Sequence, residues 1–304
     1  MMTIEECREF YAREVKFAAN LTTPGLAEAY AKVPREKFLG SGPWQIGSAE
    51  GRALSAAGIA QSSYVTVEDA RDVYHNVVVS LDRAKDINNG QPGALGRWID
   101  AMALKPGGRA YHLGCGVGYY TAIMAEVVGA SGSVVGLELE PKLAARAGEN
   151  LAAYANVRVE AGDGAAFDPG ERDAILVNCG VTHPQAIWLE RLREGGRLVV
   201  PFTMAMNAKI GQGVMIKIVR SGGVYSTELL TPVAIYSGGS LRDAALEPQV
   251  LKGLTTGGLL KLKSVRRDAH EAGETCVVHG REVCLSLAEA KHEKSGKSAD
   301  SMTA

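Results

Sequence analysis

The spacing of apolar residues predicts two helices at the start of the chain. From Ile4 to Val15, apolar side chains recur at helical spacing behind Thr3, which can cap a helix over 3–20. A second helix is expected over 24–33, with a proline in its first turn.

The next segment has a weaker pattern. Residues 40–70 are rich in Gly, Ser and Ala and show little periodicity, so we expect a long functional loop there. A short strand is expected over 77–81, a polar turn over 88–92 and a helix over 95–104.

From residue 109 onward, short apolar runs alternate with amphipathic stretches, which predicts strands alternating with helices. Such alternation favours an α/β fold with a doubly wound parallel sheet and helices on both faces. A hairpin formed by 211–220 and the residues from 224 onward is expected to close the sheet. The expected strands are 109–114, 133–138, 156–160, 172–178 and 197–201, and the expected helices are 119–129, 141–154 and 184–193.

The last part of the chain has fewer clear signals. A helix is expected over 241–253, followed by apolar stretches at 258–264 and 276–286. The tail over 291–304 is polar and is expected to be flexible.

Composition and charge narrow the class of protein. The 304 residues are 46% hydrophobic and 22% charged with a net charge of −1, which is typical of a globular protein and gives no reason to expect nucleic acid or a membrane surface as partner. No apolar run approaches the ~18 residues that span a bilayer. The five cysteines are irregularly spaced, so we expect reduced thiols and a cytoplasmic protein. The oligomeric state stays open.

The most informative motif is the glycine turn Gly114-Cys-Gly116-Val-Gly118, placed between a predicted strand and a predicted helix. Such turns let the backbone approach a nucleotide-like cofactor at the end of a strand. A dinucleotide fingerprint would need glycine at position 119, which is Tyr119. The spacing therefore favours S-adenosylmethionine over a ligand with a pyrophosphate.

Three later strand ends fit the same cofactor. Glu138 ends the second strand, 138 − 118 = 20 residues after the last glycine, where a carboxylate can accept hydrogen bonds from ribose hydroxyls. Asp163 lies between two glycines and is suited to the adenine amino group, and Asn178 ends the fourth strand. Each residue alone is also compatible with a solvated acid or a turn, but together they predict a cofactor site. The predicted cofactor-binding residues are His112, Gly114, Cys115, Gly116, Gly118, Tyr119, Glu138, Leu139, Asp163, Gly164 and Asn178.

These motifs resemble the protein-L-isoaspartate O-methyltransferase family over about residues 5–220. The resemblance is carried by Val33-Pro-Arg-Glu-Lys-Phe38, by 114–119, by Gly162-Asp-Gly164 and by 173–201. It implies a seven-stranded Rossmann-like methyltransferase sheet, an N-terminal helical layer that builds the acceptor site, ribose binding by Glu138 and adenine binding by Asp163.

We expect four regions along the chain. These are an N-terminal helical and acceptor-site region over 1–104, a cofactor-binding α/β domain over 105–235, a C-terminal extension over 236–290 and the tail over 291–304.

Two positions depart from the family pattern. His112 stands where an acid normally orients the glycine turn; it could accept one hydrogen bond there or be a core residue. The family's acceptor loop normally carries a serine where this chain has Gly90, which leaves isoaspartyl specificity open. Asn89 and Gln91 flank this glycine and offer amide groups to a carboxylate or peptide, so we predict a catalytic role for both, although the segment could be only a turn.

The predicted activity is methyl transfer from S-adenosylmethionine to a carboxylate of a peptide or protein. A carboxylate with a pKa near ~4 is already ionised at neutral pH and needs no general base. Two alternatives stay open at this point: a methyltransferase for another peptide or small-molecule acceptor, and a cofactor-binding module without catalysis.

One further cluster bears on metal binding. His270, Cys276, His279 and Cys284 follow one another within 15 residues, but their spacing matches no common zinc finger. The apolar residues among them suggest strands, and we expect no metal.

Overall fold

The computed structural model describes residues 2–48, 51, 64–85 and 87–290. The tail predicted to be flexible and a large part of the loop predicted over 40–70 lie outside the described residues. The N-terminal region is helical, as predicted, and α1 begins with a capping box in which Thr3 and Glu6 satisfy each other's backbone amides. The helices of this region are α1 (Ile4–Ala19), α2 (Leu26–Lys32), α3 (Arg35–Leu39), the 3-10 helix η1 (Ala70–Val73) and α5 (Pro92–Ala101).

A small sheet accompanies these helices. Its strand order is β2-β1-β3-β4, formed by β1 (Trp44–Gly47), β2 (Val65–Val67), β3 (Val78–Asp82) and β4 (Ile87–Asn88). Two of these strands come from the segment predicted to be a loop.

The main sheet has ten strands in the order β13-β14-β12-β11-β10-β9-β8-β5-β6-β7. The strands β7, β6, β5, β8 and β9 are parallel, while β10 and β11 form the predicted antiparallel hairpin. These seven strands form the predicted α/β sheet. Their bounds are β5 (Arg109–Leu113), β6 (Ser133–Glu138), β7 (Val157–Ala161), β8 (Arg172–Val177), β9 (Leu192–Ala205), β10 (Ile210–Ser221) and β11 (Val224–Tyr236), and the intervening helices are α6 (Tyr119–Val128), α7 (Pro141–Asn150) and α8 (Ala186–Arg191).

The C-terminal extension continues the same sheet. The short strand β12 (Ser264–Arg266) pairs with β11, and β14 (Cys284–Ser286) and β13 (Cys276–His279) follow it. The chain reaches this edge through the 3-10 helix η2 (Gly239–Leu241), α9 (Glu247–Thr255) and the 3-10 helix η3 (Leu259–Lys261). The predicted helix over 241–253 is therefore shifted, because a 3-10 turn comes before it.

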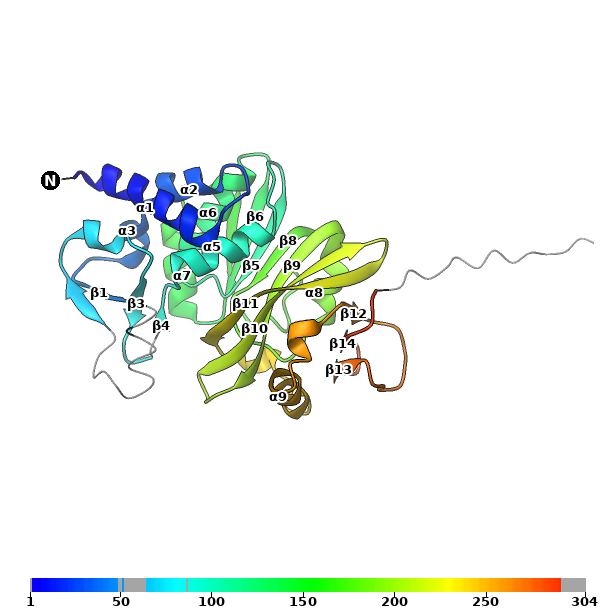
Figure 1. Cartoon of the computed structure of the whole chain (residues 1–304). Coiled ribbons are helices and arrows are strands. Elements are labelled where there is room, and N and C mark those ends of the chain that lie inside the picture. Colours follow the sequence, from blue (N-terminus) through cyan, green and yellow to red (C-terminus); the bar gives the residue numbers. More distant parts are fainter. Residues whose placement is uncertain (1, 49–50, 52–63, 86, 291–304) are drawn as a thin grey trace, which may run out of the picture.

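Two hydrophobic cores lie on opposite faces of the main sheet (Figure 1). Helices α1, α2, α5 and α6 cover one face, where Tyr11, Tyr30 and Ile123 are fully buried. The other face is covered by α8, α9 and the C-terminal extension, around Trp188 and Phe202. The carboxyl ends of the central parallel strands remain open between these layers.

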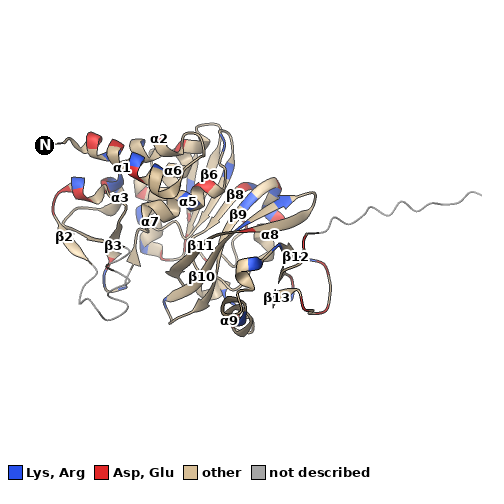
Figure 2. Cartoon of the chain, in the orientation of Figure 1, with Lys and Arg blue, Asp and Glu red and all other residues tan. Residues whose placement is uncertain are grey.

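In the view of Figure 2, Lys and Arg are interspersed with Asp and Glu on the N-terminal helices, while β10 and β11 are largely without charge. No helix in the described part of the chain has the length and apolar character needed to cross a membrane.

Candidate functional site

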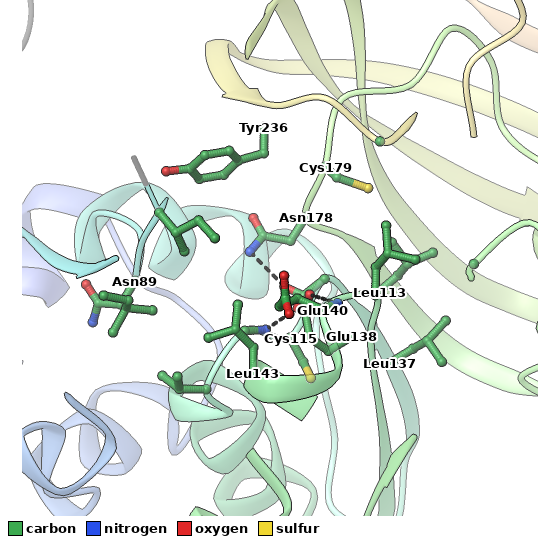
Figure 3. A pocket seen from close by; sticks show the side chains of 18 of the residues that line it. Asn89, Leu113, Cys115, Leu137, Glu138, Glu140, Leu143, Asn178, Cys179 and Tyr236 are labelled. Carbon is green, nitrogen blue, oxygen red and sulfur yellow. Dashed lines mark hydrogen bonds between the residues drawn. The ribbon is translucent and has the colours of Figure 1, made fainter. Parts of the chain in front are cut away.

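A cavity of about 360 Å³ opens at the carboxyl ends of β5, β6 and β8 (Figure 3). Most of the predicted site residues line it. Those that do are Asn89, Gly114, Cys115, Gly116, Tyr119, Glu138, Leu139, Asp163, Gly164 and Asn178.

The cavity has two walls. We call the first the glycine wall, which consists of the glycine turn 114–118, Glu138, the segment 162–164 and Asn178. The second, the amide wall, consists of Asn88, Asn89 and Tyr236. In the view of Figure 3, Asn178 lies between Tyr236 and Glu138, and Asn89 lies apart from Cys115 and Glu138.

The glycine turn depends on left-handed backbone at all three glycines, with φ angles of 75°, 58° and 90° at Gly114, Gly116 and Gly118. A Cβ atom on Gly114 would lie 3.2 Å from the backbone oxygen of Asn178. Gly118 does not line the cavity. It is the N-cap of α6, and a Cβ there would lie 2.6 Å from Leu151, so it allows α6 to pack closely.

Glu138 connects the end of β6 to the turn. Its Oε2 accepts a hydrogen bond from the Gly116 amide at 2.8 Å, and its Oε1 accepts one from the Glu140 amide at 3.1 Å. These bonds fix the carboxylate at the cavity edge, and each oxygen retains a further lone pair for a hydroxyl donor.

Asp163 is held in a similar way after β7. Its Oδ1 accepts hydrogen bonds from the Ala165 amide at 2.9 Å and from the Ser240 hydroxyl at 2.7 Å, and these lower the pKa of the Asp163 carboxyl. Ser240 belongs to the C-terminal extension, so this late segment supports the glycine wall.

The amide wall carries a buried donor without a partner. The Nδ2 atom of Asn89 makes no hydrogen bond within the described residues, although this side chain is only 9% exposed. Its Oδ1 is occupied by the Val79 amide at 3.1 Å and by Arg35 at 3.2 Å. Asn89 lines the cavity, so a shift of its side chain would offer this unpaired amide to an acceptor oxygen of a ligand.

Arg35 positions this wall from within the core. The side chain is fully buried, and its guanidinium donates to the backbone oxygens of Val73, His75 and Val77 at 2.6 to 3.0 Å, as well as to Asn89. It comes from the motif Val33–Phe38, whose role the sequence did not reveal. The motif therefore orders the segment 73–77 and the acceptor loop together.

Three predicted residues lie outside the cavity lining: Gly118, described above, His112 and Gln91. His112 is fully buried, its Nδ1 is 2.9 Å from the Thr121 hydroxyl, and burial lowers its pKa to about 3. It is a neutral core residue beneath the glycine turn, because it points from β5 toward α6. Gln91 is the N-cap residue of α5 and donates to the Asn76 carbonyl oxygen at 3.3 Å. Both positions correct the expectation that these side chains face the ligand.

The titratable side chains of the lining restrict the possible chemistry. Burial raises the pKa of Cys179 to about 12 and that of Cys115 further, so both thiols are neutral and unsuited to nucleophilic attack at pH 7. Tyr119 is 1% exposed and its hydroxyl lies 3.1 Å from that of Tyr11, which makes it part of an aromatic cluster. None of the lining residues described is a lysine or arginine.

The carboxylates of the lining suit a cationic ligand such as S-adenosylmethionine, which carries a sulfonium and an ammonium group. Glu138, Glu140 and Asp163 all border the cavity, while Glu140 is paired with Lys85 at 2.8 Å. The close-packed glycines and the fixed Glu138 carboxylate agree with the donor and acceptor groups of an adenosyl ligand.

Several lining residues were not predicted. Tyr236, Ser237, Gly238 and Leu241 come from the end of β11 and the extension, and the Tyr236 hydroxyl accepts a hydrogen bond from Asn88 at 3.1 Å. These residues belong to no sequence motif that would have marked them as part of a site. Leu143, also in the lining, belongs to the apolar face of α7.

Comparison with known proteins places these features in context. A family described as protein-L-isoaspartate(D-aspartate) O-methyltransferase matches residues 52–230. A protein-L-isoaspartate O-methyltransferase of Ignicoccus hospitalis is 35% identical over 213 residues, which is 69% of this chain and 86% of that protein. A protein-L-isoaspartate O-methyltransferase 2 of Anaeromyxobacter sp. (strain Fw109-5) is 35% identical over 204 residues, 66% of this chain and 71% of that protein.

Solved structures show the same fold. A protein-L-isoaspartate O-methyltransferase structure superposes with a TM-score of 0.62 at 24% identity, covering 80% of this chain and 69% of that one. A Plasmodium falciparum structure, described as a putative protein-L-isoaspartate O-methyltransferase in complex with S-adenosyl-L-homocysteine, has a TM-score of 0.54 at 18% identity and covers 76% and 97%.

Proposed function

This chain belongs to the protein-L-isoaspartate(D-aspartate) O-methyltransferase family, and we propose that it transfers a methyl group from S-adenosylmethionine to a carboxylate of a peptide or protein. The observation that carries the proposal is one cavity whose lining includes both the glycine turn with its fixed Glu138 and Asn89, whose Nδ2 has no partner within the described residues. We also propose a cytoplasmic location, where the five free cysteines would stay reduced.

The glycine wall would hold the cofactor. Glu138 would accept hydrogen bonds from the ribose, Asp163 from the adenine amino group, and the backbone of the glycine turn would approach the methionine part. When bound, S-adenosylmethionine supplies an electrophilic methyl group on its sulfonium.

The amide wall would hold the acceptor. Asn89 offers an N–H donor to a carboxylate oxygen, and Asn88, fixed by Tyr236, lies beside it. A carboxylate acceptor is ionised at neutral pH, so the lining needs no general base and no activated thiol. The residues then act by aligning the acceptor oxygen and excluding water.

Gly90 is the observation that favours a methyl acceptor other than an isoaspartyl residue. With a φ of 77° and an added Cβ 2.8 Å from Leu95 Cδ2, the serine that this position carries in the family pattern would be strained and would require Leu95 to shift. An isoaspartyl carboxylate is the acceptor that the names of the relatives indicate, and a different peptide carboxylate is the alternative that this glycine supports.

The cofactor assignment is tested by calorimetry. We expect Glu138→Ala to weaken S-adenosylmethionine binding by about 1.5–3 kcal/mol, roughly 10- to 150-fold, because charged hydrogen bonds are lost. Glu140→Ala is the matched control, since its carboxylate is paired with exposed Lys85, and it should change affinity far less. Equal losses of affinity in the two variants would contradict the assignment of Glu138 to the ribose.

The acceptor is tested with methyl-labelled cofactor and two peptides of identical sequence, one with an isoaspartyl residue and one with an ordinary aspartyl residue. Base-labile label on the isoaspartyl peptide alone supports the family acceptor. Cofactor binding without label on either peptide contradicts that acceptor while leaving the cofactor site standing.

A further inference from the structure

Four metal-ligating side chains converge at the far edge of the main sheet, away from the cavity. His270 lies in the loop between β12 and β13, Cys276 and His279 are at the two ends of β13, and Cys284 begins β14. One potential ligand atom from each residue lies within 4.8 Å of all the others. None of the four lines the cavity described above.

The distances approach those of a tetrahedral zinc site. Zinc binds sulfur at about 2.3 Å and nitrogen at about 2.0 Å, so neighbouring ligand atoms of a tetrahedron are separated by roughly 3.3–3.8 Å. The Sγ of Cys276 lies 3.6 Å from the Nε2 of His270. A contraction of a few tenths of an ångström to one ångström in the wider distances is enough to close the set around one ion.

The hydrogen bonds around the cluster also match those of a metal site. His270 Nδ1 lies 2.8 Å from the Asp268 backbone oxygen, so the proton is on Nδ1 and the Nε2 lone pair faces Cys276. The Gly273 amide donates to the Cys276 sulfur at 3.4 Å. Outer hydrogen bonds of this kind orient metal ligands and fix the histidine tautomer.

His279 provides an independent observation. Its Nδ1 is buried and has no hydrogen-bond partner within the described residues. Its backbone is held at both polar atoms by Gln249 of α9, at 2.7 and 3.3 Å. A buried ring nitrogen without a partner, on a residue clamped in place, needs a ligand to offset its burial.

We propose that His270, Cys276, His279 and Cys284 bind one structural Zn²⁺ ion. Two thiolates balance the charge of the ion, and four protein ligands leave no open position for a substrate, so the role is structural. The ion joins the loop 267–275 to β13 and β14, strands of four and three residues that are too short to be stable alone. It thereby anchors the edge of the sheet formed by the C-terminal extension.

The first test is the metal content of the full chain, purified without chelators and without a histidine tag. We expect about one zinc ion per chain, and after replacement by Co²⁺ the thiolate charge-transfer and visible bands of a tetrahedral cobalt site. Absence of bound metal after anaerobic reconstitution with reductant and zinc would overturn the proposal. So would a disulfide between Cys276 and Cys284 in the reductant-free protein that persists in the presence of zinc.

Cysteine variants test whether metal binding depends on the proposed ligands or on any free thiol of the chain. Cys276→Ser and Cys284→Ser should lose the bound metal and the cobalt charge-transfer band, whereas Cys7→Ser, which changes a half-buried cysteine of α1, should retain both. If a ligand variant fails to fold, the cobalt spectrum of the wild-type protein still shows whether a tetrahedral thiolate site is present. A chelator should lower the melting temperature of the wild type and of Cys7→Ser, and an unchanged melting temperature in both contradicts a structural ion.

Discussion

The glycine wall and the amide wall face the same cavity but are held by contacts of different range. Gly116 binds Glu138, 22 residues away, across two adjacent parallel strands. In the amide wall, Arg35 binds Asn89 from 54 residues away and Tyr236 binds Asn88 from 148 residues away. The comparison teaches that the glycine turn and its contact with Glu138 follow from a local strand–turn–helix pattern, whereas the amide wall exists only when distant layers are assembled.

The largest expected effect comes from removing the support of the amide wall. Arg35→Leu leaves three backbone oxygens and the Asn89 oxygen without their buried donor, and we expect a loss of about 3 kcal/mol or more in the free energy of unfolding, measured with urea. Arg97→Leu, which removes an exposed arginine with one backbone contact, should cost less than about 1 kcal/mol. Similar losses in both would contradict a special role of Arg35 in the amide wall.

The next effect concerns the core beneath the glycine wall and depends on pH. His112 has a folded-state pKa of about 3 and an ordinary value of 6.5, so the unfolded state binds more protons between these values. Stability is therefore full above pH 6.5 and decreases as the pH falls, by about 2 kcal/mol at pH 5 from this residue. Urea unfolding across this range should show a weaker pH dependence for His112→Val.

The matched control is His75→Gln, which replaces an exposed histidine and should keep the wild-type dependence. If His112→Val keeps the same slope as the wild type, another group causes the acid sensitivity.

A smaller effect is expected from a side chain at the centre of the acceptor loop. Gly90→Ser adds the strain of left-handed backbone and a contact with Leu95, and we expect a loss of about 1–2 kcal/mol in stability and no gain of isoaspartyl methylation. Gly25→Ser, at a glycine with a similar φ of 80° and no atom within 4 Å of an added Cβ, isolates the cost of the positive φ. A Gly90→Ser protein that is more active on the isoaspartyl peptide would contradict the packing argument.

The smallest expected effect concerns the glycine wall, which is not held by local contacts alone. Ser240 reaches Asp163 from 77 residues away and Asn178 donates to the Gly114 oxygen from 64 residues away, so the glycine wall also has long-range supports. Ser240→Ala should weaken S-adenosylmethionine binding by about 0.5–1 kcal/mol, measured by calorimetry, because one hydrogen bond to Asp163 is lost. Ser237→Ala, in the same cavity lining, is the control. If only Ser237→Ala weakens S-adenosylmethionine binding, the hydrogen bond from Ser240 to Asp163 does not contribute to it.

Sequence patterns predicted the parallel strands, the glycine turn and the position of Glu138 well, because strand ends and left-handed glycines are local properties. They did not predict that His112 turns toward α6, since an alternating strand pattern does not say which face a buried polar residue occupies. Gln91 was assigned to the ligand because its amide resembles that of Asn89, but its place at the start of α5 uses the side chain elsewhere. Tyr236 and Ser240 could not be predicted, because the chain brings them to the cavity only after crossing the whole sheet.

The second hydrophobic core has a consequence for the order in which the protein is made. Leu241, Val250, Leu259 and Leu285 all belong to this core and are among the last described residues to leave the ribosome. The first core is built mainly from earlier segments and can form during synthesis. Until residue 285 has emerged, the α8 face of the sheet stays partly uncovered, so the nascent chain is exposed to aggregation for as long as residues 236–285 take to translate, roughly 3–10 s at typical synthesis rates.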